Sequence, residues 1–407
     1  MNKRIYLDFN ATTPLDSLVK DAYIHALEDF ANASSLHEDG RAVHAKIEQA
    51  RAIIASLIHA KPSEIIFTSG GSESNNTVFN TMISSALTKT SRSRDNWGGK
   101  RLVITSSIEH PCVMESARHI EEAGCTVEYL PVDSQGIVDV DQYARILHAG
   151  SASAAREKQP LLVSIMMANN EIGTIQDIQK LASMAHSYHA LFHTDAVQAV
   201  GKIPVDVEAL GVDYLTLSAH KIYGPKGIGA LYVREGSPIE PLIRGGHQEK
   251  GLRAGTYNGP AIEAFGEAAR LASERLEVYG THTRLLRNRL RDGFVSKIPD
   301  IRINGHPEQV LPNTLDVSFP GAEGEAILLM LDLSGISVST GSACASGSLE
   351  PSHVLMATGV GPELAHGSIR FSLGLSTTEA EIDFVLEKMP QIIAKLRRFS
   401  TVSSKIE

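Results

Sequence analysis

The sequence has few cysteines, few aromatic residues and no long hydrophobic run. Its 407 residues include three cysteines, Cys112, Cys125 and Cys344, which are far apart and form no C-x-x-C pair. A disulfide framework or a zinc knuckle is therefore not expected, and in a reducing compartment all three would be free thiols. Cys125, which precedes a strand-like segment, and Cys112, next to Pro111, are interpreted as small core residues.

No segment approaches the roughly 18 consecutive apolar residues that are needed to span a bilayer. The longest candidate, LLVSIMMA at 161–168, is interrupted by Ser164 and is typical of a buried strand. The first residues, MNKRIYLDFNATTP, include basic residues but no apolar core behind them, so they do not resemble a secretory signal. We expect a cytoplasmic protein with no membrane partner.

Excess positive charge is also missing. The net charge is −9 and no long basic run occurs, which argues against nucleic acid or an anionic membrane as the main partner. The composition, with 43% hydrophobic and 21% charged residues, is typical of a globular protein, and the length allows about two domains.

Short apolar segments alternate with helix-like segments, such as 174–189, over much of the chain. This alternation predicts an α/β fold, with a mainly parallel sheet between layers of helices. Ligands of such sheets bind beyond the carboxyl ends of the strands, so motifs at those ends carry most weight. The predicted strands are 64–70, 101–107, 126–132, 161–168, 190–196, 214–220 and 228–233.

The last third of the chain has a different pattern. A long helical stretch over 262–294 is followed by shorter strands near 313–319 and 367–373, and Thr378 and Glu381 are spaced as a capping box that starts a final helix. We therefore expect a large domain over 15–262 and a smaller α+β domain formed by 1–14 and 263–407. The polar segment 87–100 is interpreted as an exposed loop.

Lys221 follows a predicted strand, and Asp195 lies at the end of another. A partly desolvated lysine can have a lowered pKa and form a Schiff base, although an isolated loop lysine is more often simply exposed. A carboxylate at such a strand end could pair with the protonated pyridine nitrogen of pyridoxal phosphate, although it could equally cap a following helix.

Two further motifs supply complementary chemistry. The sequence SGGS at 69–72 lies between a strand and a helix start, where glycines and unpaired N–H groups can hold a phosphate. His110 follows another strand and could stack on a pyridine ring and move protons, although a lone histidine is more often structural. Four such signals at strand ends together predict a pyridoxal 5′-phosphate enzyme of the aspartate aminotransferase fold type.

Several longer motifs resemble cysteine desulfurases of the NifS/IscS type. The resemblance runs from residue 5 to about 400 and implies a pyridoxal-phosphate-dependent transferase of fold type I in the class V aminotransferase family. Its most specific parts are the lysine motif and the cysteine segment. The motifs are YLDFNATTP, FTSGGSESNN, EHPCV, ANNEIGTIQDI, FHTDAVQAVGK, SAHKIYGPKGIGALYV, RGGHQEKGLRAGT, EGEAILLML, GSACASGSLEPSHV and AHGSIRFSLG.

The resemblance implies a role for each site residue. Lys221 would hold the cofactor covalently, Asp195 would pair with its pyridine nitrogen, and Gln198 would contact its phenolic oxygen. His110 would stack on the ring. The phosphate would be bound by Gly71, Ser72, Ser218 and His220, and by Thr256 of the partner subunit, which implies a homodimer. The substrate carboxylate would be held by Asn170, which is also expected at the cofactor, and by Arg370.

Cys344 lies in STGSACASGS, a segment of small residues that is expected to be mobile, within about 335–350 of the small domain. The resemblance implies that its thiolate attacks the sulfur of bound L-cysteine, keeps it as a persulfide and passes it to acceptor proteins for iron–sulfur cluster or thio-cofactor synthesis. No metal site is expected, apart from a possible transient iron–sulfur contact at Cys344. For an isolated cysteine, a small buried residue in a turn would be the favoured interpretation.

Other functions stay open at this point. A selenocysteine lyase or another class V aminotransferase-type enzyme would share the cofactor site but would not need Cys344. A non-catalytic scaffold with a degenerate site would not need the set Lys221, Asp195 and His110. Small departures from the family pattern, such as ANASS at 31–35 and Gly71-Ser72 where Ala-Thr is common, leave these chemical roles unchanged.

Overall fold

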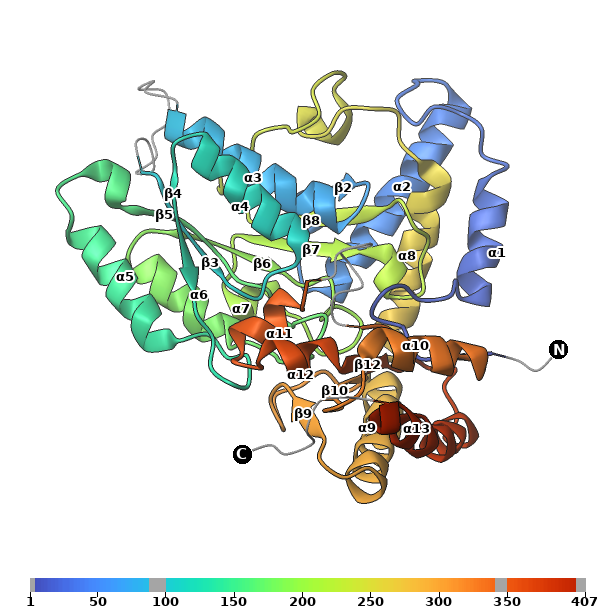
Figure 1. The fold of residues 1–407 in the computed structure, drawn as a ribbon. Coiled ribbons are helices and arrows are strands. Elements are labelled where there is room, and N and C mark those ends of the chain that lie inside the picture. The colour runs from blue at the N-terminus through green and yellow to red at the C-terminus, as the bar shows by residue number, and fades with distance from the viewer. Residues whose placement is uncertain (1–3, 88–99, 341–349, 400–407) are drawn as a thin grey trace.

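A large mixed sheet forms the centre of the molecule (Figure 1). The computed structural model describes residues 4–87, 100–340 and 350–399, and within these ranges this sheet has seven strands in the order β2-β8-β7-β6-β5-β3-β4. Only β8 runs antiparallel to its neighbours among these pairings. The strands are β2 (Ile65–Thr68), β3 (Leu102–Ser106), β4 (Thr126–Leu130), β5 (Pro160–Ser164), β6 (Leu191–Asp195), β7 (Tyr214–Ser218) and β8 (Gly229–Val233).

Helices cover both faces of this sheet, as Figure 1 shows. Neighbouring strand residues point to opposite faces, so Ile65 and Phe67 pack into one core and Ile66 into another. The first core includes side chains of α2, α5, α6 and α8, and the second those of α3 and α4. The helices are α1 (Ser17–Ala26), α2 (Glu38–Leu57), α3 (Gly71–Leu87), α4 (Pro111–Glu122), α5 (Val140–Ala152), α6 (Ile178–Ser187), α7 (Val207–Leu210) and α8 (Gly259–Glu274).

A smaller unit with its own core lies below the large sheet in Figure 1. Its antiparallel sheet has the order β12-β10-β9, and the N-terminal strand β1 (Ile5–Tyr6) pairs in parallel with β11 (Ile336–Ser337). The other elements are β9 (Arg302–Asn304), β10 (Thr314–Ser318), β12 (Ser368–Ser372), α9 (Leu276–Lys297), α10 (Gly324–Leu333), α11 (His353–Ala357), α12 (Pro362–His366) and α13 (Glu379–Phe399).

The predicted helices and strands are present in this fold, but several are shorter than predicted. The capping box is formed, because the backbone N–H of Glu381 donates to Thr378 Oγ1 at 3.3 Å and that of Thr378 donates to Glu381 Oε2 at 2.8 Å. The long helix expected over 262–294 is two helices, α8 and α9, which meet at Arg275. The Arg275 guanidinium pairs with Asp16, 2.7 Å away, which fixes this corner.

The domain division at residue 262 stays a prediction, and the packing favours a later boundary. Ile262, Phe265 and Leu271 of α8 belong to the core of the large sheet, whereas Leu286 and Leu290 of α9 belong to the smaller core. A boundary near Arg275 therefore separates the two cores better than one at 262.

A buried ion pair links α2 to the segment before α8. Arg51 donates two hydrogen bonds, each 2.7 Å long, to the two carboxylate oxygens of Glu249, and the backbone N–H of Phe67 donates to Glu249 Oε2 at 3.0 Å. Glu249 and Lys250 have positive φ angles of 47° and 58°, a conformation that costs free energy in residues with a side chain. The Arg51 pair therefore holds a strained segment in place.

Replacing Arg51 by methionine should be strongly destabilising, because the buried Glu249 carboxylate would lose its partner. We expect a loss of about 3–5 kcal/mol in the free energy of unfolding, measured by urea denaturation. The matched control is Arg118→Met, which removes an exposed pair with Glu115 and should cost no more than about 1 kcal/mol. Equal losses in the two variants would contradict this assignment.

Candidate active site

One cavity collects most of the predicted site residues. It has a volume of about 290 Å³ and lies at the carboxyl ends of β6 and β7, closed on one side by Asn10 and Ala11. The predicted residues that line it are Gly71, Ser72, His110, Asn170, Asp195, Gln198, Ser218, His220, Lys221 and Arg370. The parallel strands bring these distant segments together because their ends meet at one edge of the sheet.

Lys221 follows β7 in a single helical turn, Ala219–Lys221. Its Nζ donates to the backbone oxygens of Asn10 at 2.5 Å and Ala11 at 2.7 Å. The neighbouring His220 is held by Thr12, whose Oγ1 lies 3.2 Å from its Nδ1. Burial, together with the positive charge of Lys221, lowers the pKa of His220 to about 4. His220 is therefore a neutral hydrogen-bonding group at physiological pH.

Asp195 is the last residue of β6 and faces the same cavity. One of its carboxylate oxygens accepts a 3.0 Å bond from the backbone N–H of Val197, and the other accepts a 2.7 Å bond from Asn75 Nδ2. The segment that follows is a series of turns rather than a helix. The helix-capping interpretation of Asp195 is therefore wrong, and its carboxylate is held by a turn and by Asn75.

His110 caps the N-terminus of α4, and its Nδ1 accepts a 3.2 Å bond from the backbone N–H of Cys112. This bond places the proton of the neutral ring on Nε2. Burial lowers the pKa of His110, Asp195 opposes this effect, and Lys221 adds to it. His110 therefore acts as a neutral imidazole with an N–H donor at Nε2.

Cys112 lies at the cavity rather than only in the core. Its Sγ is 3.0 Å from His110 Nδ1 and 3.1 Å from Asn75 Nδ2. Burial, with the nearby negative charge of Asp195, raises the pKa of the thiol to about 12. Cys112 therefore remains protonated near neutral pH and is a poor nucleophile, whereas Cys125 is the core residue that the sequence predicts.

The glycine-serine motif forms the start of α3. Gly70 has φ of 152°, and a Cβ on Gly71 would come within 2.9 Å of Val197 Cγ2. Glycine at 71 therefore lets the helix start approach the turn after β6. The first N–H groups of a helix have no partner within the helix, so this start can bind an anion beside Ser72 and Ser218.

Gln198 and Asn10 form the back of the cavity. Gln198 Nε2 donates to the backbone oxygen of Asn10 at 2.9 Å, the same oxygen that accepts from Lys221. The Asn10 side chain donates to the backbone oxygen of Asn170 at 3.1 Å and to Thr314 Oγ1 at 2.9 Å. One residue thus joins the lysine, the glutamine and the smaller domain.

Arg370 comes from β12 of the smaller domain and is 2% exposed. It donates to the Asn170 backbone oxygen at 3.2 Å and to Asp8 Oδ1 at 2.8 Å. Its Nε is buried and, among the described residues, has no hydrogen-bond partner. Several of the five donors of this guanidinium thus remain for a ligand carboxylate.

Two predicted site residues are not part of this cavity as it is described. Thr256 is exposed and follows Arg253 and Gly255, which line a separate pocket of about 130 Å³. Cys344 lies outside the described residues. The roles assigned to both residues stay predictions.

The residues that the sequence did not reveal are Asp8, Asn10, Asn75, Cys112 and Lys202. All five lie within the quoted motifs YLDFNATTP, FTSGGSESNN, EHPCV and FHTDAVQAVGK, but their residue types carry no local signal for a site. Within the described ranges, no three His, Cys, Asp or Glu residues cluster closely enough to hold a metal. No helix in those ranges combines the length and apolarity needed to cross a membrane.

Glu109 adjoins His110 and is completely buried. Its Oε1 accepts bonds from Ser106 Oγ at 2.6 Å and from the backbone N–H of Met166 at 2.8 Å. Burial, and to a lesser extent the negative charge of Asp195, raises the pKa of this carboxyl group to about 8. Glu109 is therefore mostly uncharged at pH 7 and does not compete with Asp195 as the anion of the site.

Comparison with known proteins identifies the family to which this chain belongs. The sequence matches the class-V aminotransferase family over residues 5–385, so the chain belongs to that family. It is 49% identical to the cysteine desulfurase IscS of Dictyoglomus turgidum over 405 residues, which covers 98% of this chain and 97% of the relative.

Solved structures agree with the fold. A NifS-like protein is 38% identical, has a TM-score of 0.86, and matches over 96% of this chain and 100% of its own. SspA in complex with cysteine is 34% identical, has a TM-score of 0.76, and matches over 92% of this chain and 100% of its own. The predicted resemblance to cysteine desulfurases and the predicted fold type I are therefore confirmed.

Replacing Glu109 by glutamine should remove part of the pH dependence of stability. The folded-state pKa, about 8, lies above the ordinary value of 4.5, so the folded protein binds a proton that the unfolded chain has lost. The free energy of unfolding is not reduced by this group below pH 4.5, where the carboxyl group is protonated in both states. It falls as the pH rises to 8, by up to about 1.4 kcal/mol per pH unit.

Glu109→Gln should therefore unfold at a higher temperature than the natural protein at pH 8–9 and at a similar temperature near pH 5. Thermal unfolding across pH 5–9 measures the difference between the two proteins. Glu115→Gln, an exposed change on α4, serves as the control. If Glu109→Gln shows the natural pH dependence, the carboxyl group is not protonated in the folded state.

Proposed function

We propose that this chain binds pyridoxal 5′-phosphate in the Lys221 cavity and, as a cysteine desulfurase, converts L-cysteine to L-alanine while keeping the sulfur on Cys344. The supporting observation is that an amine, a carboxylate, a neutral imidazole and an anion-binding helix start face one cavity. The persulfide is then passed to acceptor proteins for iron–sulfur cluster or thio-cofactor synthesis. The cytoplasmic location stays an expectation.

The residues present fit this cofactor. The Asp195 carboxylate matches a protonated pyridine nitrogen, because its two hydrogen bonds keep it oriented. The start of α3, with Gly71 and Ser72, matches a phosphate. Lys221 would hold the cofactor covalently, and when bound, the cofactor supplies an electron sink for bonds at the substrate's α-carbon.

The carboxylate of L-cysteine would be bound by Arg370, with Asn170 beside it. Arg370 is buried and already oriented by Asp8 and the Asn170 backbone, so it needs little reorganisation to accept a planar carboxylate. His110, which carries its proton on Nε2, would contact the reacting groups and exchange protons with them.

The described segments before and after Cys344 each contact residues that line the cavity or adjoin its lining residues. Upstream, Ser339 and Arg370 exchange backbone hydrogen bonds of 3.3 and 2.8 Å. Downstream, Ser352 Oγ donates to Glu171 Oε2 at 2.5 Å, and His353 Nε2 lies 2.9 Å from the Glu109 backbone oxygen. Cys344 is five residues after Ser339 in the sequence, and five residues of extended chain span at most roughly 17 Å, which supports the proposal that its thiol acts at this cavity.

The sulfur transfer needs no reactant other than the thiolate, L-cysteine and a proton. The Cys344 thiolate attacks the sulfur of bound L-cysteine, a sulfur–sulfur bond forms, and the bond from that sulfur to the β-carbon breaks. The electron pair of the broken bond stays with the carbon, which takes up a proton and becomes the methyl group of alanine. Cys112 does not compete, because its pKa of about 12 keeps it a thiol.

A homodimer would complete the site, with Thr256 contributing to the phosphate site of the partner. Phe30 and Leu36, between α1 and α2, are 90% and 89% exposed, and this connection lies along the same upper edge in Figure 1 as the loop that precedes α8 and carries Thr256. Exposed apolar side chains at this edge support an interface between two copies.

The Cys344→Ser variant tests the sulfur step. The natural protein, after incubation with L-cysteine, should gain the mass of sulfur on Cys344 and release alanine. Cys344→Ser should keep the absorbance of the bound cofactor but form neither persulfide nor alanine. Cys125→Ala, which removes a core thiol, should retain both reactions. Alanine formation at the natural rate in Cys344→Ser would rule out the proposed role.

Mixed dimers test the role of Thr256. Thr256→Ala alone should weaken pyridoxal phosphate binding about tenfold, the effect expected for one lost hydrogen bond to a charged group. Co-expression with Lys221→Ala under separate affinity tags yields a mixed dimer with one intact site, which should recover natural affinity at that site and about half of the natural activity per dimer. If the mixed dimer behaves like Thr256→Ala, then Thr256 does not act across the interface.

A further inference from the structure

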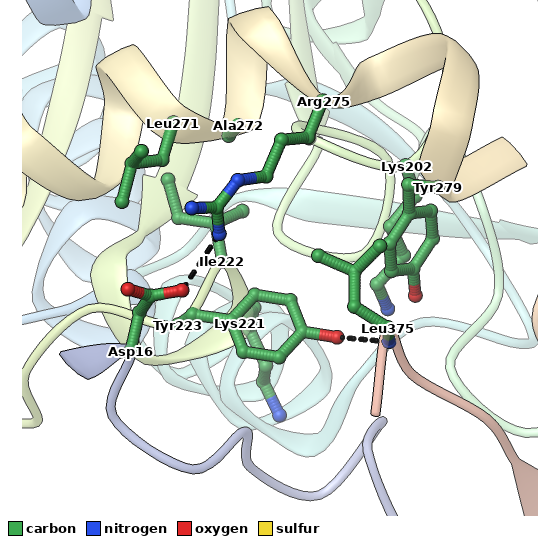
Figure 2. Close-up of a pocket in the computed structure, with 11 residues that line it drawn as sticks. Asp16, Lys202, Lys221, Ile222, Tyr223, Leu271, Ala272, Arg275, Tyr279 and Leu375 are labelled. Carbon is green, nitrogen blue, oxygen red and sulfur yellow. Dashed lines mark hydrogen bonds and ion pairs between the residues drawn. The ribbon is translucent and has the colours of Figure 1, made fainter. Parts of the chain in front are cut away.

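Lys202 is a buried lysine beside the cavity. It lies in the turns after β6, is 3% exposed, and donates from Nζ to Asn10 Oδ1 at 3.0 Å and to Gln198 Oε1 at 2.5 Å. Figure 2 shows it with Lys221 among the residues that line a small pocket of about 20 Å³, near Tyr279. Both acceptors of its amine are neutral amide oxygens.

The surroundings of Lys202 favour its uncharged form. Burial lowers its pKa well below the ordinary value, and the positive charges of Lys221 and Arg370 add to this effect. An uncharged amine has two N–H donors, and the oxygens of Asn10 and Gln198 accept two hydrogen bonds. Lys202 is thus suited to hydrogen bonding rather than to supplying charge.

The hydrogen bond to Gln198 fixes which end of that amide faces which neighbour. Its oxygen is directed to Lys202, and its nitrogen donates to the backbone oxygen of Asn10 at 2.9 Å. An amide nitrogen has two hydrogens, so a second N–H remains for the cavity that Gln198 lines. Without Lys202, the buried amide oxygen would lose its donor, and burial of an unpaired oxygen is unfavourable.

The hydrogen bond from Lys202 to Asn10 supports the same arrangement, because Asn10 contacts both Gln198 and Lys221. Asn10 Oδ1 also accepts from Asn313 Nδ2 at 3.0 Å, and the Asn10 backbone oxygen accepts from both Gln198 and Lys221. Lys202 therefore touches the two residues that set the position of the Lys221 amine and the direction of the Gln198 amide.

We propose that Lys202 is a positioning residue that orients Gln198, and with it Asn10, so that an amide N–H is presented to the phenolic oxygen of the cofactor. The inference rests on the proposed function, because it deepens the role of the same cavity. Lys202 itself contacts neither cofactor nor substrate in this assignment. Its effect reaches the cofactor only through Gln198.

A double-variant cycle tests this dependence. Lys202→Met, Gln198→Ala and the combined variant are titrated with pyridoxal phosphate, and the absorbance of each saturated protein is followed against pH. Lys202→Met should weaken binding about tenfold, as expected for loss of one oriented hydrogen bond, and should shift the absorbance titration in the same direction as Gln198→Ala. The combined variant should be no weaker than Gln198→Ala alone.

Controls separate positioning from general damage. Lys180→Met, an exposed change on α6, should bind and titrate like the natural protein, and thermal unfolding without cofactor shows whether Lys202→Met is folded. If the methionine variant does not fold, Lys202→Gln, which keeps an N–H donor, replaces it in the same cycle. Combining Lys202→Gln with Gln198→Ala should again weaken pyridoxal phosphate binding no more than Gln198→Ala alone.

If the combined variant loses affinity for pyridoxal phosphate by the product of the two single-variant losses, the inference is overturned, because Lys202 would then act independently of Gln198. Natural binding and titration in Lys202→Met would overturn it as well. Failure of the natural protein to take up pyridoxal phosphate would instead refute the proposed function, and the inference would fall with it. The two failures are distinguished by the natural protein alone.

Discussion

The backbone oxygen of Asn10 is the contact on which the cavity depends. It accepts hydrogen bonds from Lys221 and Gln198, which follow two different strands of the large sheet. The Asn10 side chain reaches Thr314 of the smaller sheet, and its backbone N–H donates to Ser372 Oγ at 2.9 Å. An N-terminal segment thus joins both sheets, and displacing it would move the lysine, the glutamine and the domain junction together.

Burial keeps several titratable side chains around this contact uncharged. His110 and His220 are kept neutral and Glu109 is kept mostly protonated, because desolvation disfavours the charged form of each. Asp195, in contrast, accepts two hydrogen bonds from the protein, which hold its carboxylate in one orientation. An oriented carboxylate at this position is what a cationic pyridine nitrogen would require.

The sequence predicts the parts of this site that follow from local pattern. Lys221 directly follows one predicted strand and Asp195 lies at the end of another, and strand ends in a parallel sheet meet at one edge, so their meeting was predictable. Lys202, Asn10 and Cys112 were not, because their roles arise from side-chain contacts between segments as far as 304 positions apart. The break between α8 and α9 was missed for a similar reason, since the Arg275–Asp16 pair that fixes it joins distant residues.

The junction between the two domains also explains how Arg370, a residue of the smaller one, reaches the cavity. Arg370 lies on β12, whose neighbour Ser339 begins the approach to Cys344, while Asp8 from the N-terminal segment fixes its guanidinium. A carboxylate bound by Arg370 would thereby lie next to the strand that pairs with Ser339. Asn170 accepts hydrogen bonds from both Arg370 and Asn10, so the groups that would bind the substrate and the cofactor are joined by one set of hydrogen bonds.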